Sequence, residues 1–345
     1  MSVTNNNERI TTEVELRKIL TSYPKILDKR IQSALDNYSI EFITQASVAA
    51  LTFSDLTLGM PFLNVKSDQF TIDNLSTISV SIPLNPDHSE IINLPFSLYF
   101  LIPGVGHGLR INGKACQIKP INDKEVETKI VLTINSVYLH CARAITRAGL
   151  WNTRLITDLL IENSTENLTA KEIIESSPYV LLSTQNAMGS TELSPRGDPA
   201  GFVNFIDENH VLLPERPGNK VAVSLTNIIN NPAVGLSFLV PGSNRIIYLE
   251  GNAHLTTDQA LLSPLVIKEK TPKLGIIIAI NRLSSHKSSA LKSTDIWQKE
   301  SHISSTALTP FSKALTAHIQ GEGLLGKLSH PIMSGIIKHD MNNLY

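Results

Sequence analysis

The sequence predicts a mainly β protein with flanking helices, an α+β fold built from two tandem barrels in one chain. Three observations lead to this fold class. Most apolar residues fall in short runs separated by Gly, Pro, Asn and Asp, as strands and turns require. Helical periodicity is confined to the two ends of the chain and one central segment. Finally, two stretches of the sequence recur later in the chain, which indicates duplication of a single domain.

The duplication is clearest in residues 134–151 and 280–297, which align with an offset of 146. The identical positions are Ile134, Asn135, His140, Ala144 and Trp151 in the first copy, and Ile280, Asn281, His286, Ala290 and Trp297 in the second. Residues 100–115 and 238–253 align in the same way with an offset of 138. A chain of 345 residues can hold two such domains, each with its own core.

The N-terminal segment is predicted to be helical. Residues 8–46 place apolar groups at helical spacing, and Thr11 or Thr12 can cap a helix ahead of Glu13 and Glu15. We predict two helices in this segment.

Strands follow in both copies, where the pattern changes to short apolar runs. The first copy contains VAALTF, QFTID, TISVSIPL, FSLYFLIPG, GLRINGKACQI and KIVLTINSVYL. The second contains YVLLST, GFVNFID, HVLLPE, VGLSFLVPG, RIIYLEGNAHL and LGIIIAINRL. So many short strands with so few helices indicate a mostly antiparallel sheet closed into a barrel in each copy.

The polar, helical segment 152–176 is predicted to connect the copies. The first domain would then span residues 1–151, with the N-terminal helices and the first barrel. The second would span residues 177–345, with the second barrel and a helical tail. In the tail, a helix is expected near residues 308–320, followed by a glycine-rich break and a last helix.

Composition excludes several classes of protein. A net charge of −1 gives no general attraction to nucleic acid or to an anionic membrane. The chain has no run of 18 apolar residues, and its N-terminus lacks the apolar core of a targeting segment, so we expect a cytoplasmic protein. Cys116 and Cys141 provide neither a disulfide framework nor metal-site spacing. Any anion must therefore be bound by a local group of residues.

The strongest candidate for such a group is SPRGDPAGF at residues 194–202. Arg196, Gly197 and Asp198 stand between two prolines, which predicts a tight turn that presents a guanidinium beside backbone amides. That combination suits a phosphate. The alternative is an ordinary hairpin turn in which Arg196 pairs with Asp198, and spacing alone gives the two about equal weight.

A second candidate turn is PERPGNK, which precedes the predicted helix SLTNIINN. Arg216, Asn219 and Lys220 surround Gly218 in this turn. An anion at the N-terminus of the helix would gain from its free amides and its dipole. The alternative is a charged surface loop.

A third candidate depends on residues 140–151 forming a helix. His140, Arg143, Arg147 and Trp151 would then share one face, where two cations and an indole could hold an anion beside a planar ring. The alternative is an exposed amphipathic stripe with Trp151 packed in the core.

The two copies have lost different parts of this set. The second copy has Ser289 and Ser293 where the first has Arg143 and Arg147, and Arg110 also has no cationic counterpart there. Conversely, the first copy has nothing like SPRGDP or ERPGN. Such complementary losses are expected if a site once built twice at a dimer interface now survives once between two fused domains.

Together, SPRGDPAGFV, LPERPGNK, NPAVGLSFLVPG, RINGKA and YLHCARAITRAGLW resemble the pyridoxamine 5′-phosphate oxidase-like superfamily of flavin-binding split β-barrels. The resemblance covers nearly the whole chain and is closest to a bacterial branch with an SPRGDP turn and an HC-to-W helix. It implies flavin mononucleotide (FMN) as the cofactor. Members are typically homodimers in which one barrel supplies turn residues to the phosphate and ribityl chain, and the other supplies residues beside the ring.

This resemblance assigns cofactor-binding roles to two sets of residues. They are Arg196, Gly197, Asp198, Arg216, Gly218, Asn219 and Lys220 on the phosphate side, and Arg110, His140, Arg143, Arg147 and Trp151 on the ring side. The chain departs from the branch at Val221 and Val223, where an arginine and an aspartate usually follow the PGN turn. Lys220 could replace that arginine only as a point charge. The resemblance assigns neither a catalytic acid or base nor a metal site.

The resemblance therefore implies an FMN-dependent oxidoreductase with one composite flavin site between the barrels. Its small-molecule redox substrate or electron donor is not identified by the residues, although pyridoxamine phosphate itself is not expected. The alternative is a non-catalytic pseudo-enzyme or ligand-binding protein with a decayed flavin site, which Val221 and Val223 favour. In both cases we expect an intrachain pseudo-dimer with one flavin per chain. Turnover and further oligomerisation stay open.

Overall fold

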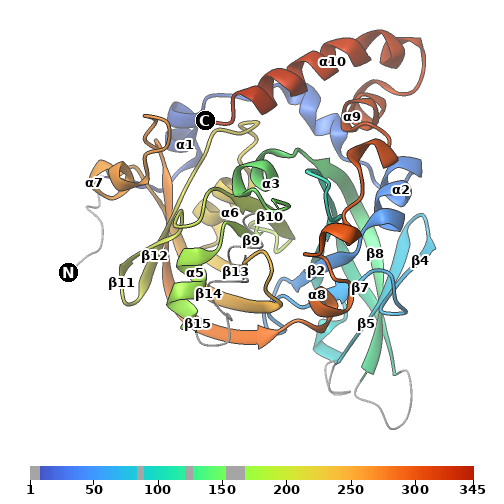
Figure 1. Cartoon of the computed structure of the whole chain (residues 1–345), viewed down its shortest axis with the longest axis horizontal. Helices are drawn as coiled ribbons and strands as arrows, with labels where there is room; N and C mark the ends of the chain where they lie inside the picture. The colour runs from blue at the N-terminus through green and yellow to red at the C-terminus, as the bar shows by residue number, and fades with distance from the viewer. Residues whose placement is uncertain (1–7, 84–88, 121–126, 153–167) are drawn as a thin grey trace. The chain divides into compact units, whose positions relative to one another are not determined.

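The computed structural model describes residues 8–83, 89–120, 127–152 and 168–345 (Figure 1). These residues form two antiparallel sheets with helices packed on them, which confirms the predicted mainly β fold with flanking helices. Of the predicted connector, residues 153–167 lie outside the described residues, whereas Ala170–Ser176 are helical as expected.

The first copy forms a sheet with the strand order β3-β2-β6-β7-β8-β5-β4. Its strands are β2 (Val48–Phe53), β3 (Phe62–Asn64), β4 (Phe70–Asn74), β5 (Thr77–Pro83), β6 (Pro95–Leu101), β7 (Gly108–Pro120) and β8 (Glu127–His140). Each of the six predicted apolar runs forms one of these strands, and only the short β3 was missed. Leu51, Phe96 and Ile111 are fully buried, because one face of the sheet packs on the core.

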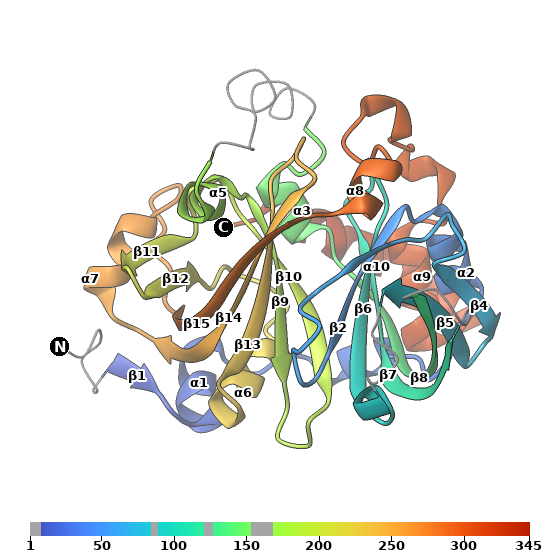
Figure 2. The ribbon, with the colours of Figure 1, turned by 90° about the horizontal axis from the view of Figure 1, so that it is seen from below.

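The second copy repeats this order strand for strand, as β10-β9-β13-β14-β15-β12-β11. Its strands are β9 (Tyr179–Gln185), β10 (Thr191–Gly197), β11 (Asn204–Asp207), β12 (His210–Pro214), β13 (Ala233–Leu239), β14 (Arg245–Thr256) and β15 (Gly275–Lys287). The short strand β1 (Arg9–Ile10) also pairs with β14. Strands β14 and β15 run side by side as a long antiparallel pair (Figure 2). The identical strand orders are the tertiary counterpart of the sequence repeat.

The helices lie mainly at the ends of the two copies. They are α1 (Glu13–Leu20), α2 (Asn37–Gln45), α3 (Arg143–Ala148), α5 (Ala170–Ser176), α6 (Val223–Asn230), α7 (Gln259–Leu262), α8 (Ser289–Ser293), α9 (Phe311–Gln320) and α10 (Leu324–Asn342). Short 3-10 turns are η2 (Lys25–Arg30), η3 (Ser89–Ile91), η4 (Ser263–Leu265), η5 (Lys299–Ser301) and η6 (Ser305–Ala307). The N-terminal cap is as predicted, since Thr12 and Glu15 form a capping box at the start of α1.

The chain divides into two compact units, each made of segments distant in sequence. Unit 1 comprises Met1–Pro24, Arg143–Lys287 and Asn343–Tyr345, and unit 2 comprises Lys25–Ala142 and Ser288–Asn342. This division differs from the predicted domains 1–151 and 177–345 at both ends of the chain. Its physical reason is burial: Leu16 of α1 lies in the core of unit 1, and Ala314 of α9 lies in the core of unit 2.

The helix that follows each sheet belongs to the other unit. Helix α3 follows β8 in sequence but packs against β10 within unit 1, and α8 follows β15 but packs against β3 within unit 2. Strands β10 and β3 hold the same edge position in their sheets. The exchange is therefore reciprocal, as expected for a duplicated chain that descends from a symmetric dimer.

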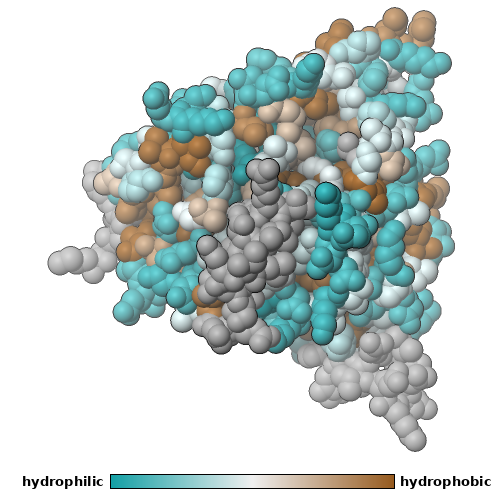
Figure 3. All heavy atoms as spheres, in the orientation of Figure 1, coloured by the Kyte–Doolittle hydropathy of each residue, from teal (hydrophilic) through white to brown (hydrophobic). Residues whose placement is uncertain are grey.

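Helix α10 packs against α9 and leaves an apolar strip exposed. The strip consists of Leu324, Leu325, Leu328, Ile332 and Ile336. Figure 3 shows apolar surface at its upper right, where Figure 1 places α10. Among the described helices, none combines the length and the hydropathy that a membrane crossing needs.

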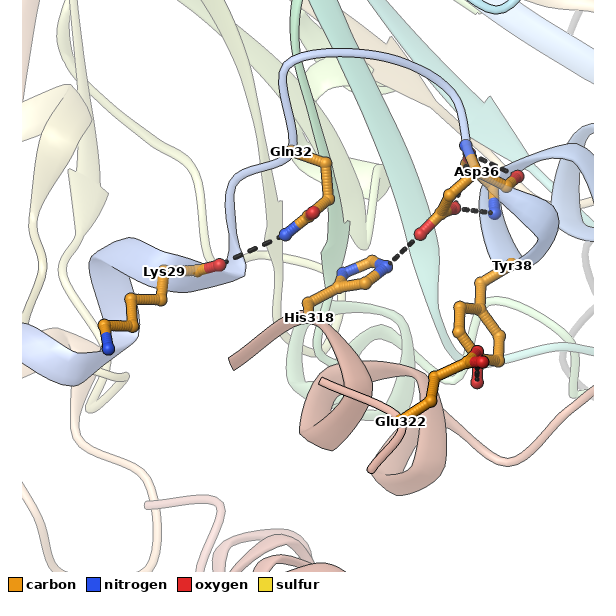
Figure 4. A network of polar contacts seen from close by, with 7 residues as sticks. Lys29, Gln32, Asp36, Tyr38, His318 and Glu322 are labelled. Atoms are coloured by element: carbon orange, nitrogen blue, oxygen red, sulfur yellow. Dashed lines mark hydrogen bonds and ion pairs between the residues drawn. The ribbon is translucent and has the colours of Figure 1, made fainter. Parts of the chain in front are cut away.

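Asp36 links α2 to α9 within unit 2 (Figure 4). Its Oδ1 accepts a hydrogen bond from the Ser39 amide at 2.8 Å and thereby caps α2, while its Oδ2 lies 2.6 Å from Nε2 of His318. Burial raises the pKa of Asp36, but the bonds from His318 and Ser39 outweigh it and hold the pKa below the ordinary 3.8. Beside this pair, the Tyr38 hydroxyl donates to Glu322 at 2.8 Å.

We predict that Asp36→Asn lowers the free energy of unfolding at neutral pH by about 1 kcal/mol, because a cap and a charge-assisted bond are weakened. The pKa of Asp36 is depressed in the folded state, so its contribution is present above 3.8 and is lost as the pH falls through the folded pKa. Urea unfolding at several pH values should therefore show a steeper acid loss for the wild type than for Asp36→Asn. The exposed Asp68→Asn is the matched control and should keep the wild-type slope. Equal slopes for Asp36→Asn and wild type would contradict the prediction.

Candidate functional site

Four of the arginines singled out in the sequence come together in unit 1. Arg143 and Arg147 lie on α3, Arg196 lies on β10, and Arg216 follows β12. We call these four residues the arginine cluster. Their partners are two carboxylates, a group of backbone carbonyls and Tyr345, and they are described in turn below.

Arg196 lies on a strand, so the predicted tight turn at this residue is wrong. It pairs with Val180 of β9, and the turn begins only after Gly197. The two flanking prolines suggested a turn. However, β10 is the edge strand of its sheet, where the missing N–H of Pro195 costs no hydrogen bond to a neighbouring strand. Arg196 forms an ion pair with Glu215 and donates a hydrogen bond to Ser224 on α6. The alternative pairing of Arg196 with Asp198 does not occur.

Asp198 instead binds Arg216. Nε of Arg216 donates to Oδ2 of Asp198 at 2.5 Å, and its Nη2 donates to the Leu265 carbonyl at 2.9 Å. The Asp198 side chain is completely buried and that of Arg216 nearly so. A second donor, the Tyr345 hydroxyl, reaches Oδ1 of Asp198 at 2.7 Å. The SPRGDP and ERPGN motifs are therefore joined by a buried ion pair with several further hydrogen bonds.

The two arginines of α3 donate to neutral carbonyl groups. Nη1 of Arg143 reaches the Pro217 carbonyl at 2.9 Å, and Nη2 of Arg147 reaches the same oxygen at 2.5 Å. Nε of Arg147 also donates to the Leu344 carbonyl at 2.9 Å. Burial lowers the pKa of Arg147, and the neighbouring charge of Arg143 lowers it further. This part of the cluster carries positive charge that no acceptor oxygen of Pro217 or Leu344 neutralises.

Tyr345 lies among the cations of unit 1. Its ring centroid is 5.4 Å from Cζ of Arg147, 5.7 Å from Cζ of Arg216 and 5.5 Å from Nζ of Lys268. Lys270 also donates to the main-chain oxygen of Tyr345 at 2.6 Å. Cations over an aromatic face attract the ring electrostatically. Burial and the bond to Asp198 raise the pKa of Tyr345, so its hydroxyl stays protonated and acts as a donor.

A strained turn places the two lysines on Tyr345. Lys268 and Glu269 have φ values of 49° and 61°, between the paired residues Ile267 and Lys270. Glycine or asparagine usually occupies these positions, because a left-handed backbone costs other residues about 1–2 kcal/mol each.

The PGN turn is held from the side of α1. Arg17 donates to the carbonyls of Lys220 and Val221 at 2.7 and 2.9 Å, and Lys220 Nζ donates to Thr21 at 3.1 Å. Asn219 accepts from the Val221 amide at 3.1 Å in a local turn. Helix α6 does follow this turn as predicted. The Lys220 ammonium contacts Thr21, and its role as a replacement for the missing arginine stays a prediction.

His140 is not on a helix with Arg143, so the predicted shared face is wrong. His140 pairs with Gly108 as the last residue of β8, because the hairpin with β7 continues to that point. Helix α3 covers only Arg143–Ala148. Gly149, which follows it, has a φ of 58°, a value typical of the residue that terminates a helix. Trp151 follows that end and is half-buried in unit 1.

Arg110 and His140 lie in unit 2 around the ring of Tyr138. Arg110 Cζ is 4.2 Å from the ring centroid, and His140 stacks on the ring at 4.7 Å. Arg110 is 1% exposed. Burial, together with the charges of Arg110 and Arg30, lowers the pKa of His140 well below its ordinary value, so the imidazole is neutral at pH 7. Their assignment to the ring side of a flavin site stays a prediction.

In unit 2, α8 carries Ser289 and Ser293 at the positions where α3 carries Arg143 and Arg147. There Ser293 of α8 accepts a hydrogen bond from Asn64 of β3 at 3.1 Å, where Arg147 of α3 stands in the other copy. Unit 2 also has an apolar cavity of about 500 Å³ beside α2, α9 and α10, which no predicted site residue lines. In the described residues, no group of three or more His, Cys, Asp or Glu is arranged to hold a metal, and both cysteines are free.

Comparison with known proteins identifies the second copy. The sequence model of the family described as pyridoxamine 5′-phosphate oxidase matches residues 168–300. The second copy belongs to the pyridoxamine 5′-phosphate oxidase-like superfamily. This confirms the resemblance seen in the sequence. No curated protein matches the chain.

Solved structures of related fold each align with about a third of the chain. HupZ of Group A Streptococcus is 18% identical over 35% of this chain and 95% of its own, with a TM-score of 0.30. A putative pyridoxamine 5′-phosphate oxidase from Lactobacillus delbrueckii is 17% identical over 36% of this chain and 97% of its own, with a TM-score of 0.28. An F420 reductase is 17% identical over 33% and 94%, with a TM-score of 0.27.

Sequence reasoning missed the partners of the four arginines. Glu215 precedes Arg216 directly, so its charge was visible within LPERPGNK. Lys268 and Tyr345 belong to no sequence motif. Their importance comes from contacts with residues far away in the sequence.

We predict that Gly197→Ala destabilises unit 1 by about 2 kcal/mol, the usual scale of overpacking. A Cβ at Gly197 would overlap the Ala144 carbonyl and lie 3.1 Å from Cβ of Ala148, so α3 would have to move off β10. Thermal or urea unfolding measures the loss. Gly218→Ala is the matched control, because its Cβ would meet nothing closer than 4.0 Å. A loss equal to that of the control would show that α3 does not pack tightly on Gly197.

We also predict strong coupling between Asp198 and Arg216. Asp198→Leu or Arg216→Met alone should cost about 3–5 kcal/mol, because each leaves an uncompensated buried charge. The double variant should cost clearly less than the sum, since it removes both charges. A double-mutant cycle by urea unfolding measures the coupling energy. Additive losses would mean that the two side chains do not interact in solution.

Proposed function

We propose that the protein is an FMN-binding flavoprotein of the pyridoxamine 5′-phosphate oxidase-like superfamily, with one flavin site per chain at the arginine cluster. The observation that carries the proposal is the convergence of Arg143, Arg147, Arg196 and Arg216 in unit 1. These side chains come from both sequence copies, since α3 follows the first sheet and β10 belongs to the second. The mirror combination in unit 2 has Ser293 where unit 1 has Arg147, which supports a single site.

The groups present fit a phosphate monoester. Arg143 and Arg147 both donate to the Pro217 carbonyl, an acceptor that satisfies hydrogen bonds but not charge. A phosphate dianion would accept these hydrogen bonds and also neutralise the charge. Charge-assisted hydrogen bonds are about twice as strong as neutral ones. Arg196 and Arg216 are already paired with Glu215 and Asp198, so they fix the geometry of the site more than they contribute surplus charge. The phosphate would therefore depend chiefly on the arginines of α3.

The roles of the chain in this proposal are binding and orientation. A bound flavin supplies the hydride or electron transfer, as in other flavoproteins. The arginine cluster would fix the phosphate end, and Arg110, His140 and Trp151 would lie beside the ring if the two units form the expected pseudo-dimer. A small-molecule redox substrate or electron donor completes the proposed oxidoreductase activity. No described side chain is assigned as a catalytic acid or base.

A second candidate function is ligand binding without turnover, by a flavin site that has decayed. Two observations favour it. Val221 and Val223 stand where the bacterial branch carries an arginine and an aspartate. In addition, the Lys220 ammonium is engaged by the Thr21 hydroxyl. Reduction of bound FMN by NADH or NADPH, followed by reoxidation with an electron acceptor, separates this function from the proposed oxidoreductase.

The proposal predicts that titration with FMN saturates at one equivalent per chain. Arg143→Ala should weaken FMN affinity by about 1.5–3 kcal/mol, the scale of a hydrogen bond to a charged group. Arg143→Lys should recover part of the loss, because the charge returns without the fork of two donors. Ser289→Ala, at the equivalent position of the other copy, is the matched control and should bind like the wild type. Quenching of flavin fluorescence measures each affinity.

Two outcomes would count against the proposal. Binding of two equivalents per chain would refute the single surviving site. Equal FMN affinities for wild type, Arg143→Ala and Ser289→Ala would show that the α3 arginines are not part of the site. Riboflavin, which lacks the phosphate, should bind Arg143→Ala and wild type equally well.

A further inference from the structure

Residues 343–345 contact two members of the arginine cluster, Arg147 and Arg216. Unlike α10 before them, these residues belong to unit 1. The Leu344 carbonyl accepts two donors from Arg147, and the Tyr345 hydroxyl donates to Asp198. The Tyr345 main-chain oxygen accepts from Lys270.

This arrangement has the features of a bound ligand. An aromatic ring lies near three cations, an acceptor oxygen lies on Arg147, and a polar group at the far edge of the ring meets Asp198. An aromatic ligand whose anionic oxygen lay at Arg147 would meet the same cations. The surrounding groups thus suit an aromatic anion, and the ring of Tyr345 with the carbonyl of Leu344 occupies its place.

The segment offers Arg147 a neutral acceptor, the Leu344 carbonyl. Leu344 and Pro217 offer only carbonyl oxygens to Arg147, whose pKa is lowered by burial and by Arg143. An anion at the same place would neutralise charge as well as accept hydrogen bonds. Leu344 and Tyr345 are also only half-buried, so no core packing has to be broken when they leave.

We propose that Asn343–Tyr345 is a displaceable internal occupant of the arginine cluster, which competes with a phosphate-bearing aromatic ligand for Arg147. The segment must leave before the ligand's phosphate reaches Arg147, so it lowers the apparent affinity of the site. The inference rests on the proposed flavin site for the identity of the ligand, but displacement by an anion does not require that ligand to be FMN.

The first experiment compares FMN affinities of the full chain and of a variant lacking residues 343–345. If the segment is seated in about nine molecules of ten, its removal raises the apparent affinity about tenfold, because only the open fraction binds. Tyr345→Phe loses the bond to Asp198 but keeps the ring, and should give a smaller rise. Asn342→Ala, an exposed position at the end of α10, is the matched control and should leave the affinity unchanged. Unchanged or weaker FMN binding after deletion would overturn competition.

The second experiment follows the segment directly, without relying on flavin. Protein labelled with fluorotyrosine gives a ¹⁹F resonance for Tyr345, assigned by its loss in Tyr345→Phe. Inorganic phosphate, and separately FMN, should move this resonance to the position of an exposed tyrosine in the wild type. Arg147→Lys weakens the hydrogen bonding to the Leu344 carbonyl. In this variant the Tyr345 resonance should lie near the position of an exposed tyrosine before any phosphate or FMN is added.

Together, the two experiments distinguish failure of the proposed flavin site from failure of the proposed internal occupant. Displacement by phosphate without any FMN binding would support the internal occupant and refute the flavin site. FMN binding with an unmoved Tyr345 resonance would support the flavin site and refute the internal occupant.

Discussion

The buried pair of Asp198 and Arg216 is the interaction on which the candidate site depends. It joins the end of the edge strand β10 to the turn after β12, segments that the sequence separates by a complete hairpin. Asp198 also accepts a hydrogen bond from the Tyr345 hydroxyl, and Arg216 donates one to the Leu265 carbonyl. The same pair therefore links four segments of unit 1: the end of β10, the turn after β12, η4 and residues 343–345. A buried pair gains stability from hydrogen bonds to its remaining donors and acceptors. Here the Leu265 carbonyl and the Tyr345 hydroxyl each provide one.

The reciprocal exchange of helices explains why a site can survive once in a duplicated chain. Helix α3 packs on β10, and α8 packs on the equivalent strand β3. Each candidate site therefore needs a helix from one copy and an edge strand from the other. Once the copies are fused, a cation can be lost from α8 without affecting α3, and the two positions evolve separately. Arg147 and Ser293 show the result of that separation.

Charge explains how the cluster differs from an ordinary set of surface ion pairs. Arg196 and Arg216 have carboxylate partners, whereas the described hydrogen bonds of Arg147 are to carbonyl oxygens. Burial of an arginine against neutral acceptors is costly. The left-handed turn at Lys268 and Glu269 adds a further local cost at the same place.

The sequence by itself determined most of the strands, the duplication, the Thr12 cap and the superfamily resemblance. These depend on local periodicity, capping chemistry and motif order, all of which act between residues close together in the chain. It also found the four arginines, because the two copies differ at their positions. Only the tertiary structure decided the partners of those arginines and the membership of α1, α3 and the tail in the two units. Spacing predicted a turn at Arg196 and a helix through His140, but pairing with β9 and β7 extended both strands. The contact of Tyr345 with Asp198 joins residues 147 positions apart, and no local pattern encodes such a distance.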